Sequence, residues 1–180
     1  MMIESERLSL IPMTPAFLEA CLAGDLAAAS SSIGLAVPPE WLQEQGLMRL
    51  RLEQLRQNPE LQPWLLRAIG LRQDRAMIGH IGFHSQPGAD YLREWAPGGV
   101  EFGYTIFPSH RRQGYAQEAA QALMGWAQRE HGVRQFVVTI SPDNLPSLRI
   151  AARIGFRKVG THFDEEDGVE DVFVWSGGEG

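Results

Sequence analysis

Apolar and polar positions follow several different periods along the chain, and each change of period predicts a different element. Residues 7–12 alternate as in a strand, and residues 14–23 predict a helix that opens with Thr-Pro. Residues 24–37 are small and polar and predict a loop or a short helix. Apolar side chains recur at helical spacing over residues 41–55, and Asn-Pro at 58–59 ends that helix.

The rest of the chain alternates between strand-like and helix-like stretches. The predicted elements are, in order, strands at 63–71 and 76–84 joined as a hairpin, a loop at 85–98, a strand at 100–108, a helix at 116–131, a strand at 135–141, a helix at 144–154, and strands at 156–163 and 169–175. Gly79 and Gly82 indicate a close backbone approach or a bulge in the second hairpin strand. Without a repeat or a linker, this mixed α/β order predicts a single domain over residues 1–180.

Composition restricts the classes of protein that the chain can represent. A length of 180 residues with 44% hydrophobic and 21% charged residues is typical of one globular domain with its own core. The single Cys21 excludes an intramolecular disulfide and a thiolate metal cluster. A net charge of −6 disfavours broad nucleic-acid binding. With no membrane-length apolar run and no signal-peptide layout, we expect a cytoplasmic protein that binds neither nucleic acid nor membrane.

The segment from Val100 to the following helix carries the strongest chemical signal. A strand ends at Pro108, a basic turn with Arg111 and Arg112 follows, and a long helix then begins. Free N–H groups and the positive end of the helix dipole favour an anion at such a helix start. Gly114 allows the backbone to approach a phosphate closely. The segment therefore predicts a phosphate or pyrophosphate site.

The same residues resemble a known family. Residues 111–116, Arg-x-x-Gly-x-Ala, resemble the Arg/Gln-x-x-Gly-x-Gly/Ala signature of the GNAT superfamily of N-acetyltransferases. Residues 101–104, Glu-Phe-Gly-Tyr, are similar to a strand of its RimJ/RimL-type branch, as is Ser-Glu-Arg-Leu-Ser-Leu at 5–10. Asn-x-x-Ser at 144–147, followed by Ile-Gly-Phe at 154–156, resembles a further family segment. The resemblance covers nearly the whole chain.

The resemblance implies a fold and a co-substrate. The fold is a central, mostly antiparallel sheet of six or seven strands, splayed in the middle and flanked by about four helices. The co-substrate is acetyl-CoA, and no metal is needed. Thr105 and Ile106 would contact its pantetheine arm through their main chain, and the Asn144 amide would bond the same arm. The pyrophosphate would lie against the residues of the turn and the helix start, namely Arg111, Arg112, Gln113, Gly114, Tyr115, Ala116 and Gln117.

The resemblance also implies catalytic roles, each with a structural alternative. Glu101 would accept the amine proton directly or through water; alternatively it lies on an exposed strand face or in an ion pair. Ser147 would be the acid that protonates the thiolate, or simply a helix serine that bonds its own backbone. Asn144 is equally suited to be a helix N-cap. Many relatives have a tyrosine as the acid at the position of Ala151, and this chain departs from that pattern.

The predicted reaction is acetyl transfer to a primary amine by direct attack, since Cys21 is far in sequence from the motifs. The acceptor stays open among a protein N-terminus, a polyamine, an amino acid and an antibiotic, as does a monomeric or homodimeric state. Two rivals are a non-catalytic acyl-CoA-binding domain and a doubly wound nucleotide-binding domain. The latter requires its glycine turn after the first strand, whereas here it follows residue 100.

Two further features allow alternative interpretations. His80 and His84 alternate along one strand but lack a third ligand, which makes a metal site improbable. The acidic residues at 164–167, with Glu170 and Asp171, would either attract a cationic acceptor or form a solvated turn; the solvated turn is favoured.

Overall fold

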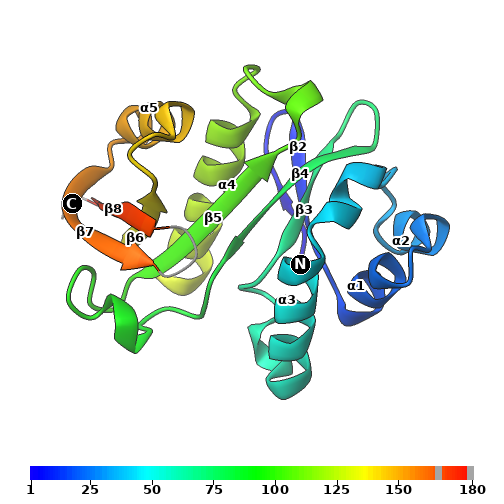
Figure 1. The fold of residues 1–180 in the computed structure, drawn as a ribbon, viewed down its shortest axis with the longest axis horizontal. Helices are drawn as coiled ribbons and strands as arrows, with labels where there is room; N and C mark the ends of the chain where they lie inside the picture. The colour runs from blue at the N-terminus through cyan, green and yellow to red at the C-terminus, as the bar shows by residue number, and fades with distance from the viewer. Residues whose placement is uncertain (165–167, 178–180) are drawn as a thin grey trace. The chain divides into compact units, whose positions relative to one another are not determined.

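The computed structural model of the chain describes residues 1–164 and 168–177 (Figure 1). Its strands are β1 (Ile3–Glu4), β2 (Leu8–Pro12), β3 (Arg67–Leu71), β4 (Ala76–Phe83), β5 (Val100–Ile106), β6 (Gln135–Ile140), β7 (Arg157–Asp164) and β8 (Gly168–Ser176). Its α-helices are α1 (Pro15–Leu22), α2 (Leu26–Ile33), α3 (Gln45–Gln57), α4 (Tyr115–His131) and α5 (Leu145–Ile154). Short 3-10 helices are η1 (Pro39–Gln43), η2 (Pro59–Leu61), η3 (Asp90–Leu92) and η4 (Pro108–His110).

The strands are hydrogen-bonded in the order β1-β2-β3-β4-β5-β6-β8-β7. Registered pairs are antiparallel except β5 with β6, whose parallel register joins Val100 to Phe136 and Glu101 to Val137. In the described residues this register ends at Glu101, although β5 continues to Ile106. The predicted mixed α/β, mostly antiparallel fold is confirmed.

The described part of the chain has eight strands and five α-helices, more than the six or seven strands and about four helices that we expected. The two residues of β1 are too few to show alternation. The second helix, α2, consists mainly of alanine and serine, and its Leu26, Ala29 and Ile33 pack on the core; Asp25 accepts a hydrogen bond from the N–H of Ala28 at its start. The helix expected at 41–55 is divided into η1 and α3.

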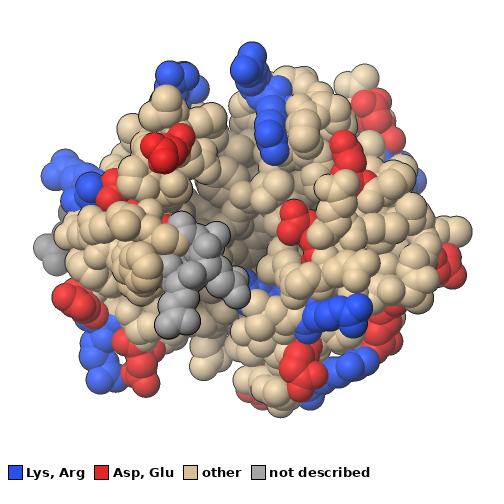
Figure 2. All heavy atoms as spheres, in the orientation of Figure 1, with Lys and Arg blue, Asp and Glu red and all other residues tan. Residues whose placement is uncertain are grey.

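The chain divides into two compact units, which we describe separately. The first unit comprises Met1–Gly82 and Tyr104–Leu123, and the second comprises Phe83–Gly103 and Met124–Gly180. Figure 2 shows acidic and basic side chains interspersed on the visible face rather than gathered by sign. None of the helices in the described part of the chain is both long and apolar enough to cross a membrane.

The first unit has a core between its sheet strands and α1, α2 and α3 (Figure 1). Thr14 caps α1 by accepting the N–H of Phe17 at 3.3 Å, and Pro15 occupies the first turn. Phe17 and Trp41 are fully buried in this core. The predicted close approach at Gly79 is confirmed, because a Cβ there would lie 2.1 Å from the Thr105 carbonyl oxygen.

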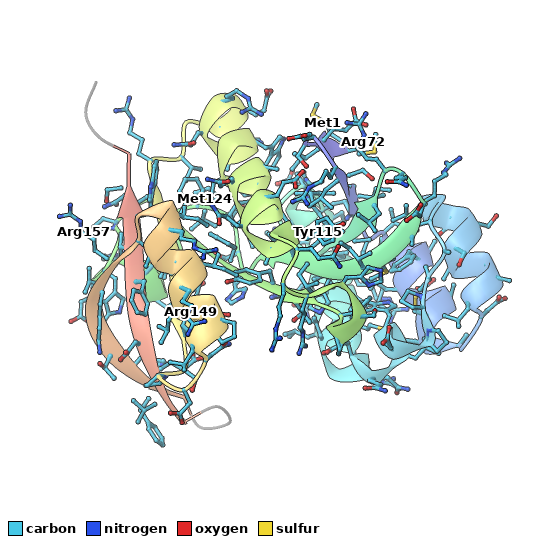
Figure 3. All side chains as sticks on the ribbon, turned by 90° about the horizontal axis from the view of Figure 1, so that it is seen from above. Met1, Arg72, Tyr115, Met124, Arg149 and Arg157 are labelled. Atoms are coloured by element: carbon cyan, nitrogen blue, oxygen red, sulfur yellow. The ribbon has the colours of Figure 1, made fainter. Side chains whose placement is uncertain are left out.

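The second unit has a smaller core on β6 and β8, with α5 lying beside these strands (Figures 1 and 3). Val137, Val172 and Val174 pack there with Leu92 and Ala96 of the 85–98 loop. This loop covers one face of the strands and so supplies side chains to the cavity described below.

Candidate active site

The turn between β5 and α4 lies in the first unit and has left-handed backbone at two of its residues. Arg112 and Gly114 adopt left-handed φ values of 63° and 83°. Residues 111–114 are exposed, and the 17-residue helix α4 begins immediately afterwards at Tyr115, which Figure 3 labels at the helix start. The first N–H groups of such a helix have no intrahelical acceptor. The predicted site residues of this segment, from Arg111 to Gln117, are thus brought together at one helix start.

Arg111 holds the turn against the strand that precedes it. Its Nε donates to the Ile106 carbonyl oxygen at 2.8 Å. Ile106 is itself buried, so this contact fixes the end of β5 relative to the turn. Arg111 thus has a structural contact in addition to the positive charge that it brings to the turn.

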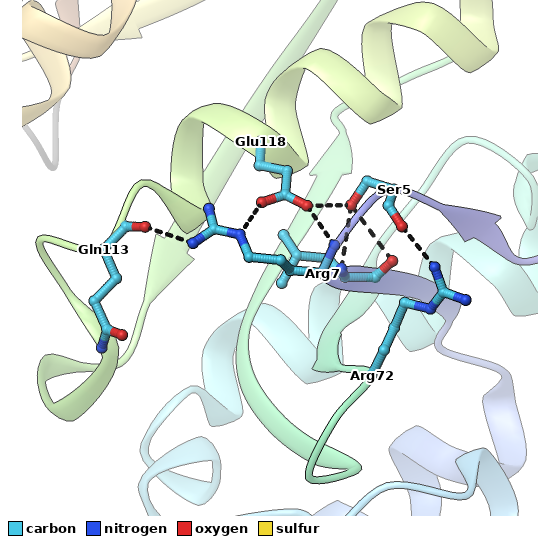
Figure 4. Close-up of polar contacts among 6 residues, drawn as sticks. Ser5, Arg7, Arg72, Gln113 and Glu118 are labelled. Atoms are coloured by element: carbon cyan, nitrogen blue, oxygen red, sulfur yellow. Dashed lines mark hydrogen bonds and ion pairs between the residues drawn. The ribbon is translucent and has the colours of Figure 1, made fainter.

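An ion pair that we did not predict fixes the other side of the turn (Figure 4). Arg7, just before β2, donates from Nε to Glu118 Oε2 at 2.6 Å and from its backbone N to Oε1 at 2.8 Å. Arg7 Nη1 donates to the Gln113 carbonyl oxygen at 3.0 Å, and the Arg7 guanidinium lies 4.5 Å from the centre of the Tyr115 ring. Ser5 Oγ also donates to Glu118, at 2.7 Å.

These donors decide the charge of Glu118. Partial burial raises the pKa of Glu118, but the hydrogen bonds from the Arg7 backbone, Ser5 and the Arg7 side chain outweigh burial and lower it overall. The carboxylate is therefore ionised and neutralised locally by Arg7, so that it does not cancel the positive helix start. In the sequence the only signal was a glutamate in the first helical turn, a position that the dipole alone explains.

The second unit contains a cavity of about 580 Å³. Its floor is the sheet face formed by β5, β6, β7 and β8, and its cover is the loop that contains η3. The lining residues are His84, Tyr91, Leu92, Trp95, Glu101, Val137, Thr139, His162, Glu170 and Val172. The cavity thus combines carboxylates, imidazoles and aromatic rings.

Glu101 is the predicted catalytic residue that lies in this cavity. It is 6% exposed, which shows that the alternative of an exposed strand face is wrong. Thr139 Oγ1 donates to its Oε1 at 2.8 Å, and His84 Nδ1 lies 3.4 Å from its Oε2. Burial raises the pKa of Glu101, but hydrogen bonds from His84, Thr139 and Tyr91 outweigh burial and lower it. The side chain is therefore a carboxylate at neutral pH.

Asn144 and Ser147 lie together at the start of α5. The Asn144 Oδ1 accepts the backbone N–H of Ser147 at 3.2 Å, so the N-cap role of Asn144 is confirmed. Its amide NH₂ group is still a donor for another partner. In the described part of the chain, neither residue is among those that line the cavity around Glu101.

His80 and His84, which the sequence placed on one strand, have different environments. His80 is 6% exposed in the core of the first unit, where its ring centroid lies 5.1 Å from that of Trp41. His84 follows β4 and belongs to the second unit, beside Glu101. Within residues 1–164 and 168–177, no group of three or more His, Cys, Asp or Glu side chains could hold a metal ion.

The acidic segment near the C-terminus is only partly described. Residues 165–167 lie outside the described residues, so the solvated-turn interpretation is untested there. Glu170 lines the cavity. Asp171 accepts from Lys158 Nζ at 2.6 Å and from Thr161 at 3.2 Å, which makes it a structural residue of β8.

Comparison with known proteins agrees with both the turn and the fold. Residues 7–157 match the model of the acetyltransferase (GNAT) domain. An uncharacterized N-acetyltransferase of Bacillus subtilis, YnaD, is 34% identical over 90 residues, which are 50% of this chain and 48% of YnaD. The chain thus aligns with about half the length of that curated relative.

Solved structures extend the likeness to the whole fold. A GNAT-family acetyltransferase from Bacillus anthracis covers 98% of both chains with a TM-score of 0.63 and 23% identity. RimL, a ribosomal alpha-N-protein acetyltransferase solved in complex with coenzyme A, covers 98% of both chains with a TM-score of 0.64 and 19% identity. Because the strand order, the turn before α4 and the family match over residues 7–157 agree, the chain belongs to the GNAT acetyltransferase family.

Proposed function

We propose that the chain transfers the acetyl group of acetyl-CoA to a primary amine by direct attack, without an acyl-enzyme. The observation that carries the proposal is the buried, ionised Glu101 in a cavity, with His84 and Thr139 hydrogen-bonded to its two oxygens. Burial of a carboxylate on a strand costs free energy unless the carboxylate is paired, hydrogen-bonded or used in a reaction. The acceptor would be a protein N-terminus, a polyamine, an amino acid or an antibiotic.

The turn before α4 fits a CoA pyrophosphate. It is exposed, it has left-handed backbone at Arg112 and Gly114, and Arg7 neutralises the carboxylate in the first turn of the helix. Acetyl-CoA would supply a thioester carbonyl carbon for the amine to attack. The complex of RimL with coenzyme A supports this choice of co-substrate. Thr105 and Ile106 would contact the pantetheine arm through their backbone, and the Asn144 amide would donate to it.

The Glu101–His84 pair would remove the proton that the amine must lose. An alkyl amine with pKa near 10.4 costs about 4–5 kcal/mol to neutralise at pH 7, so a base is most useful for such acceptors. Ser147 would supply a proton to the thiolate. Cys21 is unsuited to a covalent route, because it is 3% exposed and burial raises the pKa of its thiol, an effect that a hydrogen bond with Trp41 only partly offsets.

One observation favours a second function. Ala151, at the position where many relatives have the acid tyrosine, is 3% exposed and therefore part of the core. A chain without that hydroxyl would suit an acyl-CoA-binding or sensing domain in the cytoplasm, as a monomer or a homodimer.

Release of CoA thiol from acetyl-CoA, measured with a broad panel of amines, tests the proposal. We expect turnover with at least one class of acceptor. Tight acetyl-CoA binding by calorimetry without turnover on any amine would favour the sensing domain instead. Matching Glu101→Gln controls would show that any turnover comes from this site.

A further inference from the structure

The two members of the Glu101–His84 pair are not equally suited to accept a proton. Glu101 has hydrogen bonds with three side chains, those of His84, Thr139 and Tyr91. Two carboxylate oxygens have about four lone-pair positions, so few are left for an incoming amine. These bonds also outweigh burial and lower the pKa of Glu101, which weakens the carboxylate as a base.

His84 is more accessible to solvent than Glu101. Its side chain is 39% exposed, against 8% for Glu101, so it is the member of the pair that solvent and an acceptor can reach. Its backbone N–H donates to the Glu101 carbonyl oxygen at 2.9 Å, and its Nδ1 faces Oε2. The residue is thus fixed to Glu101 through both its main chain and its ring.

The other ring nitrogen of His84, Nε2, lies close to Gly103. A Cβ added to Gly103 would lie 3.1 Å from His84 Nε2, so the absence of a side chain there leaves room for the imidazole. With Nδ1–H donated to Glu101, the neutral ring carries its lone pair on Nε2. An imidazole is also the side chain whose proton exchange lies nearest neutral pH.

We infer that His84 is the general base of the acetyl transfer and that Glu101 is the positioning residue that orients its ring. This assignment rests on the proposed function. An alkylammonium first releases one proton to water and becomes the neutral amine. As the bond between the amine nitrogen and the acetyl carbon forms and the carbon–sulfur bond breaks, Nε2 takes a second proton from the nitrogen. The imidazolium then releases that proton to water, and the thiolate takes one proton from water, directly or through Ser147, so each acetyl transfer releases one proton in net.

Four other titratable groups line the cavity with His84. They are Tyr91 on η3, Glu101 on β5, His162 on β7 and Glu170 on β8. The pH dependence of kcat/KM therefore reports on this group of residues, and variants must identify the contribution of His84.

The test is the pH profile of kcat/KM from pH 5.5 to 9.5, with an alkyl amine that the wild-type chain acetylates. We expect His84→Gln to lower kcat/KM roughly 100-fold or more. It should also remove the decrease of kcat/KM at low pH that protonation of the base causes. Acetyl-CoA affinity by calorimetry should not change. Added imidazole should restore part of the activity of His84→Ala, which a purely structural role of His84 would not allow.

Two comparisons separate His84 from its neighbours. His162→Gln, in the same cavity, should keep the decrease of kcat/KM at low pH that protonation of the base causes, because His84 is still present. Glu101→Gln should also keep this low-pH decrease of kcat/KM, because the imidazole of His84 is still present to accept the proton.

Two results would overturn the assignment. Near wild-type kcat/KM for His84→Gln, with Glu101→Gln inactive, would make Glu101 the base and leave the proposed function standing. A wild-type chain that binds acetyl-CoA but acetylates no amine would overturn the proposed function and this assignment with it.

Discussion

Arg7 and Glu118 are 111 residues apart in sequence, yet they share two hydrogen bonds, of 2.6 and 2.8 Å. The pair joins the start of β2 to the first turn of α4 (Figure 4). Through Arg7 Nη1 it also reaches the carbonyl oxygen of Gln113, in the turn that we propose as the pyrophosphate site. The geometry of that turn therefore depends on the N-terminal segment as well as on its own residues.

Replacing Arg7 should weaken acetyl-CoA binding. Arg7→Ala removes the hydrogen bond to the Gln113 carbonyl oxygen. It also leaves the negative charge of Glu118 unpaired beside the proposed pyrophosphate site. Because Arg7 is 43% and Glu118 17% exposed, we expect a loss of about 1–2 kcal/mol, or roughly tenfold in Kd by calorimetry. The matched control is Arg72→Ala, which removes a hydrogen bond to the Ser5 carbonyl, away from the turn.

A double variant separates charge from positioning. If the uncompensated carboxylate causes the loss, adding Glu118→Gln to Arg7→Ala should recover part of the affinity. Equal Kd values for the wild type, Arg7→Ala and Arg72→Ala would show that the turn keeps its shape without Arg7.

Gly114→Val should abolish most acetyl-CoA binding while unfolding stays cooperative. The φ of 83° at Gly114 is strained for a β-branched residue, and the new side chain would stand where the phosphate approaches. Gly132→Val is the control, since Gly132 has a φ of 65° with nothing within 4 Å of an added Cβ and lies beyond the end of α4. Calorimetry that gives an unchanged affinity for a folded Gly114→Val chain would contradict a pyrophosphate site here.

His80 should make the first unit less stable in acid. Burial, assisted by the charge of Arg51, lowers the pKa of His80 from 6.5 to about 4. Between these values the unfolded chain binds a proton that the folded chain does not, so the free energy of unfolding falls as pH falls. The decrease from pH 7 to pH 4 should be about 3 kcal/mol from this residue.

Urea unfolding of the wild type and His80→Leu at several pH values measures this contribution. The slope of stability against pH between 4 and 6.5 should be smaller in His80→Leu than in the wild type, and His162→Gln, at an exposed position of β7, is the matched histidine control. Protonation of Glu101 and Glu118 at low pH also lowers the free energy of unfolding. Only the difference in slope between the variants therefore identifies the contribution of His80. Identical slopes for all three chains would exclude His80 as the source.

Glu101→Gln should lower kcat with little effect on acetyl-CoA affinity, and most strongly for acceptors of high pKa. Ser147→Ala should have only a modest effect, within about tenfold, because a thiolate is a good leaving group that water can protonate. Steady-state rates with a high-pKa and a low-pKa amine check both. Equal rates for the wild type and Glu101→Gln across pH 6–9 would remove Glu101 from the reaction.

The sequence was most informative where local rules decide the structure. The order of β5, the basic turn and α4 could be predicted because the proline, the glycine and the apolar period of α4 act over a few residues. The hairpin of β3 and β4 and the cap of α5 at Asn144 were predictable for the same reason. Residues 26–33 were harder, since alanine and serine carry almost no periodic signal.

The features that we missed depend on contacts between distant segments. Nothing near Arg7 indicates Glu118, and nothing in the loop at 85–98 shows that Tyr91 and Trp95 cover Glu101. The role of His84 was hidden in the same way, because its partner is 17 residues later on another strand. Such pairs become visible only when the register of the sheet is known.

The indole of Trp95 occupies the place where a side chain at position 160 would be. A Cβ on Gly160 would lie 2.3 Å from its ring, and Trp95 also lines the cavity. The absence of a side chain at Gly160 on β7 therefore helps to determine the width of the cavity. Gly160 is not one of the residues that we propose to transfer the proton. Under the proposed function, paired substitutions at Gly160 and Trp95 thus offer a route to change which acceptor sizes the cavity admits, with Glu101 and His84 left in place.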